Sequence, residues 1–165
     1  MKSRLFLSVL SALLLASFGC SKSEPKTAAS APAAEASAAS ARAIEITGND
    51  AMMFSVTEIV AKPGETLRVT FRNVGKMPKQ AMSHNWVLLK PMSEGEVNAF
   101  GLAASSKAPA YLPEDRSAVL AHTKMLGGGE SDQIEVKVPA TPGVYPFVCT
   151  FPGHFAIMKG RLVVQ

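Results

Sequence analysis

The residues best suited to chemistry lie close together near the C-terminus. Cys149, His154 and Met158 fall within ten residues of one another, around a Pro152-Gly153 turn that lets the chain fold back on itself. A loop of this kind can aim a thiolate, an imidazole and a thioether at one point. With a second imidazole, this donor set suits both oxidation states of copper, because little rearrangement is needed between them.

The second imidazole must come from elsewhere in the chain. His84 stands at the start of an apolar run, residues 84–89, where a strand would place it beside a loop at the same end of a sheet. The remaining histidine, His122, is expected at the surface, because the donor set is already complete. Zinc could take the same donors tetrahedrally, but it would give the protein no redox chemistry, so the sequence favours copper.

The use of cysteine supports a metal site. Residues 1–4 are positively charged and residues 5–18 are apolar, a stretch too short to span a membrane. We predict a signal peptide at residues 1–19. The segment ending at Cys20 resembles a bacterial lipobox, in which the cysteine is diacylated, although ordinary cleavage nearby is an alternative. Cys149 then has no disulfide partner, and bound metal would explain an unpaired thiol in an oxidising compartment.

Composition changes after the leader. Residues 20–42 are rich in Ala, Ser and Pro, and we predict a lipid-anchored linker that spans roughly 25 Å if it is flexible. Without Lys2 and Arg4 of the leader, 15 basic residues face 13 acidic ones. This balance gives no basic footprint for nucleic acid.

From residue 43 to residue 165 the sequence indicates one all-β domain. Short alternating runs, such as residues 67–71 and 134–138, are separated by Gly and Pro. Seven or eight such strands predict an antiparallel β-sandwich of Greek-key type. One segment differs, because it spaces apolar and small residues at i, i+3, i+4 and i+7. This stripe predicts one short helix or flap insertion, carried by Val97, Phe100, Gly101 and Ala104.

Four blocks of this domain resemble the azurins, a branch of the cupredoxin family. They are Gly48-Asn49-Asp50, Ser83-His84-Asn85-Trp86-Val87-Leu88, Ala121-His122-Thr123-Lys124 and the Cys149–His154 turn with Met158-Lys159-Gly160 after it. The resemblance implies a cupredoxin-type sandwich that holds one type 1 (blue) copper ion. It also implies an electron carrier that shuttles single electrons between redox partners and is not an enzyme.

The resemblance further implies a role for individual residues. By this resemblance, the imidazoles of His84 and His154 and the thiolate of Cys149 would bind copper in one plane. The thioether of Met158 would be the axial ligand, and the backbone carbonyl of Ser83 a distant one. Asn85 would tie the two ligand loops together, and the backbone N–H groups of Asn85 and Phe151 would point at the sulfur. An apolar patch around the C-terminal histidine would dock partners and would contain Met52, Met77, Ala81, Met82, Pro152, Ala156 and Ile157.

Two departures from the azurin pattern are visible. The domain offers no cysteine for the disulfide that azurins usually carry near the N-terminus. Many azurins also have a buried, titrating histidine in the loop where this chain reads Asn73-Val74-Gly75. Asn73 cannot titrate as that histidine does.

The expected partners follow from these assignments. They are redox proteins such as c-type cytochromes or a copper or haem reductase, together with the membrane through the lipid anchor. We expect a monomer on the periplasmic side of the cell envelope, and Ser21 after the lipobox cysteine favours the outer membrane. Two alternatives are a protein that buffers or delivers copper, and an enzyme with a Cys149 nucleophile. The enzyme alternative lacks a carboxylate in the 149–158 loop to orient a histidine base.

Overall fold

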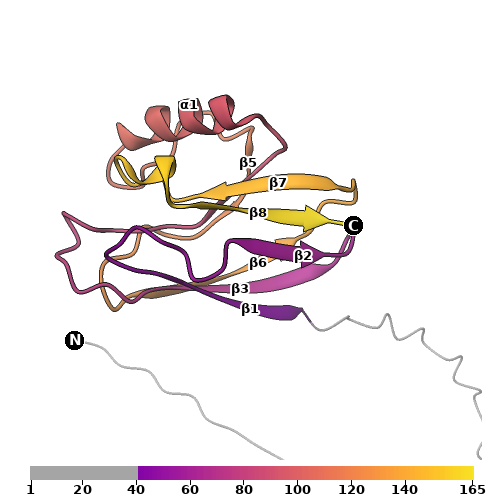
Figure 1. Cartoon of the computed structure of the whole chain (residues 1–165), viewed down its shortest axis with the longest axis horizontal. Coiled ribbons are helices and arrows are strands. Elements are labelled where there is room, and N and C mark those ends of the chain that lie inside the picture. The colour runs from indigo at the N-terminus through magenta and orange to yellow at the C-terminus, as the bar shows by residue number, and fades with distance from the viewer. Residues whose placement is uncertain (1–40) are drawn as a thin grey trace, which may run out of the picture. The chain divides into compact units, whose positions relative to one another are not determined.

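The computed structural model describes residues 41–165, so the predicted signal peptide, Cys20 and nearly all of the predicted linker lie outside the described residues. The described part is a two-layered β-sandwich with a helix on one side (Figure 1). Its elements, in chain order, are β1 (Arg42–Gly48), β2 (Glu58–Ala61), β3 (Thr66–Asn73), β4 (Val87–Leu89), α1 (Glu94–Ser105), β5 (Val119–His122), β6 (Ser131–Lys137), β7 (Gly143–Val148), the 3-10 turn η1 (His154–Ala156) and β8 (Lys159–Val164).

The strands form two sheets, with the orders β1-β3-β6 and β2-β8-β7-β4-β5. The prediction of a sandwich with seven to eight strands is confirmed. The expectation of wholly antiparallel pairing is wrong, because β1 pairs parallel with β3 and β2 pairs parallel with β8. The reason is topological. Strand β2 lies between β1 and β3 in the chain but belongs to the other sheet, so the chain crosses over and returns before β3 begins.

The core lies between the two sheets. In β3 the apolar positions Leu67, Val69 and Phe71 are buried, while Arg68 and Arg72 face solvent, as period-two alternation requires. Trp86 is also buried and its ring lies against Phe147 at a centroid distance of 5.3 Å. Burial of these side chains stabilises the frame that holds the ends of the strands in place.

Helix α1 confirms the predicted helical stripe. A capping box starts it, because the Ser93 side chain accepts from the Glu96 N–H while the Glu96 carboxylate accepts from the Ser93 N–H. Its buried side carries Val97, Gly101 and Ala104 and covers an apolar cluster on the β4 and β7 sheet (Figure 1). No helix within residues 41–165 is long and apolar enough to cross a membrane.

Gly101 allows α1 to approach the turn that follows β7. A Cβ at this position would collide with the ring of Phe155 in η1. Phe155 follows His154 directly in the chain. The contact between α1 and Phe155 therefore helps to position the loop that contains His154. A Cβ at Gly95, in the first turn of the same helix, would meet no atom within 4 Å.

We predict opposite effects for alanine at these two glycines. Gly101→Ala should lower the free energy of unfolding by about 1–3 kcal/mol, since overpacking outweighs the gain in helix propensity. Gly95→Ala should raise it by up to about 1 kcal/mol, because only the propensity changes. Urea denaturation of both variants and the wild type measures these changes in the free energy of unfolding. Equal effects of the two substitutions would show that the contact with Phe155 imposes no constraint.

Candidate metal centre

The ends of three elements meet at one end of the sandwich. Cys149 follows β7 directly, His154 opens η1 and Met158 immediately precedes β8. Two backbone hydrogen bonds close this loop, from the Cys149 N–H to the Met158 carbonyl at 2.9 Å and from the Met158 N–H to the His154 carbonyl at 2.7 Å. Gly153 makes the turn possible with a φ of 82°, which a residue with a Cβ rarely adopts.

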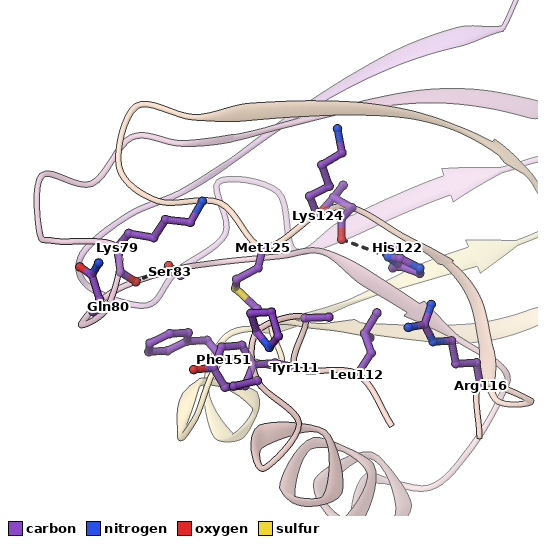
Figure 2. Close-up of a pocket in the computed structure, with 14 residues that line it drawn as sticks. Lys79, Gln80, Ser83, Tyr111, Leu112, Arg116, His122, Lys124, Met125 and Phe151 are labelled. Atoms are coloured by element: carbon purple, nitrogen blue, oxygen red, sulfur yellow. Dashed lines mark hydrogen bonds between the residues drawn. The ribbon is translucent and has the colours of Figure 1, made fainter. Parts of the chain in front are cut away.

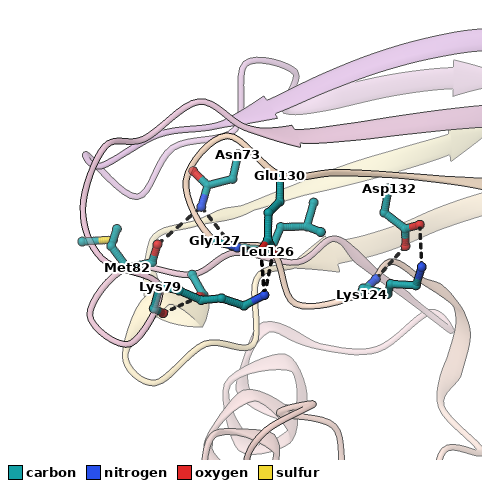
Figure 3. Close-up of polar contacts among 9 residues, drawn as sticks. Asn73, Lys79, Met82, Lys124, Leu126, Gly127, Glu130 and Asp132 are labelled. Carbon is teal, nitrogen blue, oxygen red and sulfur yellow. Dashed lines mark hydrogen bonds and ion pairs between the residues drawn. The ribbon is translucent and has the colours of Figure 1, made fainter.

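His84 reaches the same place from the segment before β4. Its N–H donates to the Leu126 carbonyl at 2.9 Å, and the Leu126 N–H donates back at 2.8 Å. Buried Asn73 supports this pair, since its side-chain amide donates to the same Leu126 carbonyl at 3.0 Å (Figure 3). Its side-chain oxygen accepts from the Gly75 N–H at 2.9 Å. Asn73, which stands where many azurins have a titrating histidine, therefore helps to hold the segment that contains His84 in place.

Three donor atoms form a compact triangle. The distances are 3.8 Å between Cys149 Sγ and His84 Nδ1, 3.6 Å between Cys149 Sγ and His154 Nδ1, and 3.2 Å between the two Nδ1 atoms. A point equidistant from all three lies about 2 Å from each, close to a metal–nitrogen bond length. Among the described residues, this cluster is the one arrangement of at least three His, Cys, Asp or Glu side chains that could hold a metal.

Burial sets the protonation of these groups. It lowers the pKa of His154 to about 4, with repulsion from His84 as a second cause, and it also lowers the pKa of His84. Both imidazoles are therefore neutral near pH 7, as metal ligands must be. Burial raises the pKa of the Cys149 thiol to about 12. Without a metal the sulfur keeps its proton, and a bound cation would have to displace it.

The backbone partly offsets the cost of a negative sulfur. The N–H groups of Asn85 and Phe151 act on Cys149 as hydrogen-bond donors and lower its pKa. Asn85 also joins the two ligand loops through its side chain. Its oxygen accepts from the Thr150 N–H and its amide donates to the Thr150 hydroxyl, each at 2.8 Å.

Met158 is fully buried, and the end of its side chain and the His84 ring both lie close to the backbone of Gly48. A Cβ on Gly48 would lie 2.8 Å from Met158 Cε and 3.2 Å from His84 Cδ2. Glycine leaves room for the thioether and the imidazole at once. Ser83, the predicted distant ligand, places its carbonyl oxygen 4.0 Å from the Cys149 sulfur. Its hydroxyl donates to the Lys79 carbonyl.

His122 takes no part in the triangle. It ends β5, is half-buried, and its Nδ1 lies 3.1 Å from the Thr123 carbonyl oxygen. The enzyme alternative also loses support, since a thiol that is wholly buried with a pKa near 12 is the opposite of an activated nucleophile.

The predicted docking residues differ in their exposure, and the histidine that they are predicted to surround is nearly enclosed. His154 is only 3% exposed, while Met77 is 42% and Ile157 60% exposed. Met52 and Met82 are half-buried, and the other predicted members are exposed, namely Ala81, Pro152 and Ala156.

Three contributors to this region were not predicted from the sequence. Gly48 was part of a recognised block, but its contact with Met158 depends on tertiary structure. Thr150 lies next to Cys149, yet its pairing with Asn85 joins residues 65 positions apart. Tyr111 sits edge-on against Phe151 at a centroid distance of 5.3 Å. No local signal in the sequence identifies Tyr111.

The donor types fit copper better than other metals. One soft thiol, two imidazoles and an adjacent thioether at the end of a β-sandwich are the donor set of a blue-copper protein. The fold and the site therefore define the class as cupredoxin.

Comparison with known proteins identifies the family. Residues 41–165 match the family of "Copper binding proteins, plastocyanin/azurin family". The chain is 43% identical over 123 residues to Azurin-1 of Alcaligenes xylosoxydans xylosoxydans, covering 72% of this chain and 94% of that protein. It is 44% identical over 120 residues to azurin of Achromobacter denitrificans, covering 71% and 80%.

Solved structures of blue-copper proteins have the same fold. Auracyanin A, a "blue" copper protein from Chloroflexus aurantiacus, superimposes with a TM-score of 0.68 at 33% identity, covering 74% of this chain and 98% of that one. Reduced auracyanin from Roseiflexus castenholzii gives 0.67 at 36% identity, covering 76% and 98%. The chain belongs to the plastocyanin/azurin family of copper-binding proteins. It is a blue-copper electron-transfer protein with one type 1 copper, not an enzyme.

Proposed function

We propose that His84, Cys149 and His154 are the equatorial copper ligands of this electron carrier. Met158 serves as the axial ligand and the Ser83 carbonyl as a distant fifth contact. The observation that carries this assignment is the triangle of Sγ and two Nδ1 atoms, with sides of 3.2–3.8 Å.

The surrounding residues hold this geometry fixed. Copper supplies the one-electron couple, and the protein contributes neutral imidazoles, a dry pocket and donors toward the sulfur. The Asn85–Thr150 pair and the His84–Leu126 pair limit movement of the two ligand segments. A rigid, buried site favours fast electron exchange and opposes the release that copper delivery would need.

Spectroscopy of ligand variants tests the assignment. Cys149→Ser should abolish the intense visible band of thiolate-to-copper charge transfer, since no thiolate remains. Met158→Gln should retain a shifted band and lower the reduction potential, because the axial ligand tunes it. His122→Asn is the control and should leave the spectrum unchanged. A copper-loaded Cys149→Ser protein that keeps the wild-type colour would contradict the assignment.

We infer that electrons enter and leave at the apolar patch around His154. Its exposed members include Met77 and Ile157, and methionine side chains adapt to different partners. Weak redox encounters use small interfaces, which suits c-type cytochromes or a copper or haem reductase. A monomer leaves this patch free.

A charge placed in the patch tests this role. Ile157→Lys should slow electron self-exchange between two copies by about tenfold, because like charges meet in the encounter. Val144→Lys is the matched control. Val144 is 54% exposed and lies at the opposite end of β7 from Cys149. Equal rates for Ile157→Lys and the wild type would place the docking surface elsewhere.

We propose that the protein works on the periplasmic side of the cell envelope, anchored to the outer membrane by lipid on Cys20. The leader-like residues 1–19 and the lipobox-like segment before Cys20 support this location. The Ala/Ser/Pro-rich residues 20–42 would act as the tether.

Mass spectrometry of the mature protein tests the anchor. The wild type should begin at Cys20 with added acyl chains and sediment with membranes, whereas Cys20→Ser should lack this mass and stay in the soluble fraction. An unmodified N-terminus within the Ala-rich tract would contradict lipidation.

A further inference from the structure

A pocket of about 530 Å³ lies beside the metal centre and is not part of the docking patch. Its lining consists of Lys79, Gln80, Ser83, residues 108–112, Arg116, residues 122–125 and Phe151 (Figure 2). This volume is within the range of small-molecule sites in proteins. The proposed docking patch, by contrast, consists of exposed and half-buried apolar side chains.

The walls of the pocket are largely apolar. Leu112, Met125 and the rings of Tyr111 and Phe151 line it. Tyr111 adopts a φ of 50°, which is unfavourable for a bulky residue, and this conformation accompanies the edge-on contact of its ring with Phe151. Apolar walls of this kind bind aromatic or branched hydrocarbon groups.

The charge in the pocket has one sign. Its lining contains Lys79, Arg116 and Lys124 but no Asp or Glu. Glu130 neutralises Lys79 at 2.7 Å, and Asp132 lies 3.8 Å from Lys124 (Figure 3). Arg116 forms no ion pair with any residue in the range 41–165. In the view of Figure 2, Arg116 and His122 lie toward one end of the pocket, and Lys79 and Gln80 lie toward the other.

We propose that this pocket binds a small organic anion, with its aromatic or branched apolar body against Tyr111 and Met125 and its carboxylate or sulfonate paired with Arg116. The planar guanidinium suits two-point contact with such a group. The volume of about 530 Å³ suits a small organic molecule. The occupant would touch Phe151, whose ring lies 4.8 Å from that of His154.

A titration with 2-naphthoate tests the proposal. NMR spectra of the copper-loaded, reduced protein should show saturable shifts at Tyr111, Met125 and Phe151, with a dissociation constant of about 1 mM or tighter for a ligand of this size. The neutral analogue 2-naphthamide should bind at least about fivefold more weakly, because it lacks the charge that pairs with Arg116. Binding is measured without reference to copper colour, so its failure is distinguishable from failure of the ligand assignment.

Matched variants locate the site. Arg116→Gln should weaken naphthoate binding by about fivefold, while Arg72→Gln removes the same charge from β3 in the other sheet and should have no effect. Ala110→Trp should block the pocket and abolish the shifts. Equal weakening by both arginine variants, equal binding of the amide, or shifts confined to other residues would overturn the proposal. So would a Glu-rich peptide that binds here while naphthoate does not, since the surface would then be a protein dock.

Discussion

Holding one thiol and two imidazoles at a single buried point is the constraint on which this structure depends. Each group is costly to bury in its charged form, and the pKa directions of Cys149, His84 and His154 reflect that cost. In the folded protein all three are neutral near pH 7, with their donor atoms already facing one another. A cation that displaces the thiol proton completes the arrangement, so the metal and the fold stabilise each other.

The sandwich satisfies this constraint by fixing the ends of strands. The rigid elements β7 and β8 hold both ends of the Cys149–Met158 loop, and the bridge to Leu126 holds His84. Buried polar side chains then join the loops, with Asn85 on one side and Asn73 on the other. Because their hydrogen bonds are made within the protein, these amides add rigidity without leaving a buried polar group unpaired.

Phe151 links the site with its surroundings. Its backbone N–H acts on the Cys149 sulfur, its ring contacts His154, and it also lines the pocket that contains Arg116. The proposed docking patch and this pocket therefore both include residues of the Cys149–Met158 loop but differ in chemistry. The first presents exposed apolar side chains such as Ile157. The second is lined by Arg116, which forms no ion pair with another residue of the described range 41–165.

The sequence alone determined what depends on local spacing. The Cys149–Met158 turn, the stripe from Val97 to Ala104 and the alternation in β3 each reflect residues a few positions apart, whose geometry follows from a turn, a helix or a strand. Contacts between distant segments needed the tertiary structure. The parallel pairs β1–β3 and β2–β8, the room that Gly48 leaves for Met158, and the wall that Tyr111 forms beside Phe151 all depend on how the two sheets stack. Local sequence patterns do not predict how the two sheets stack, because the stacking depends on packing of the whole core.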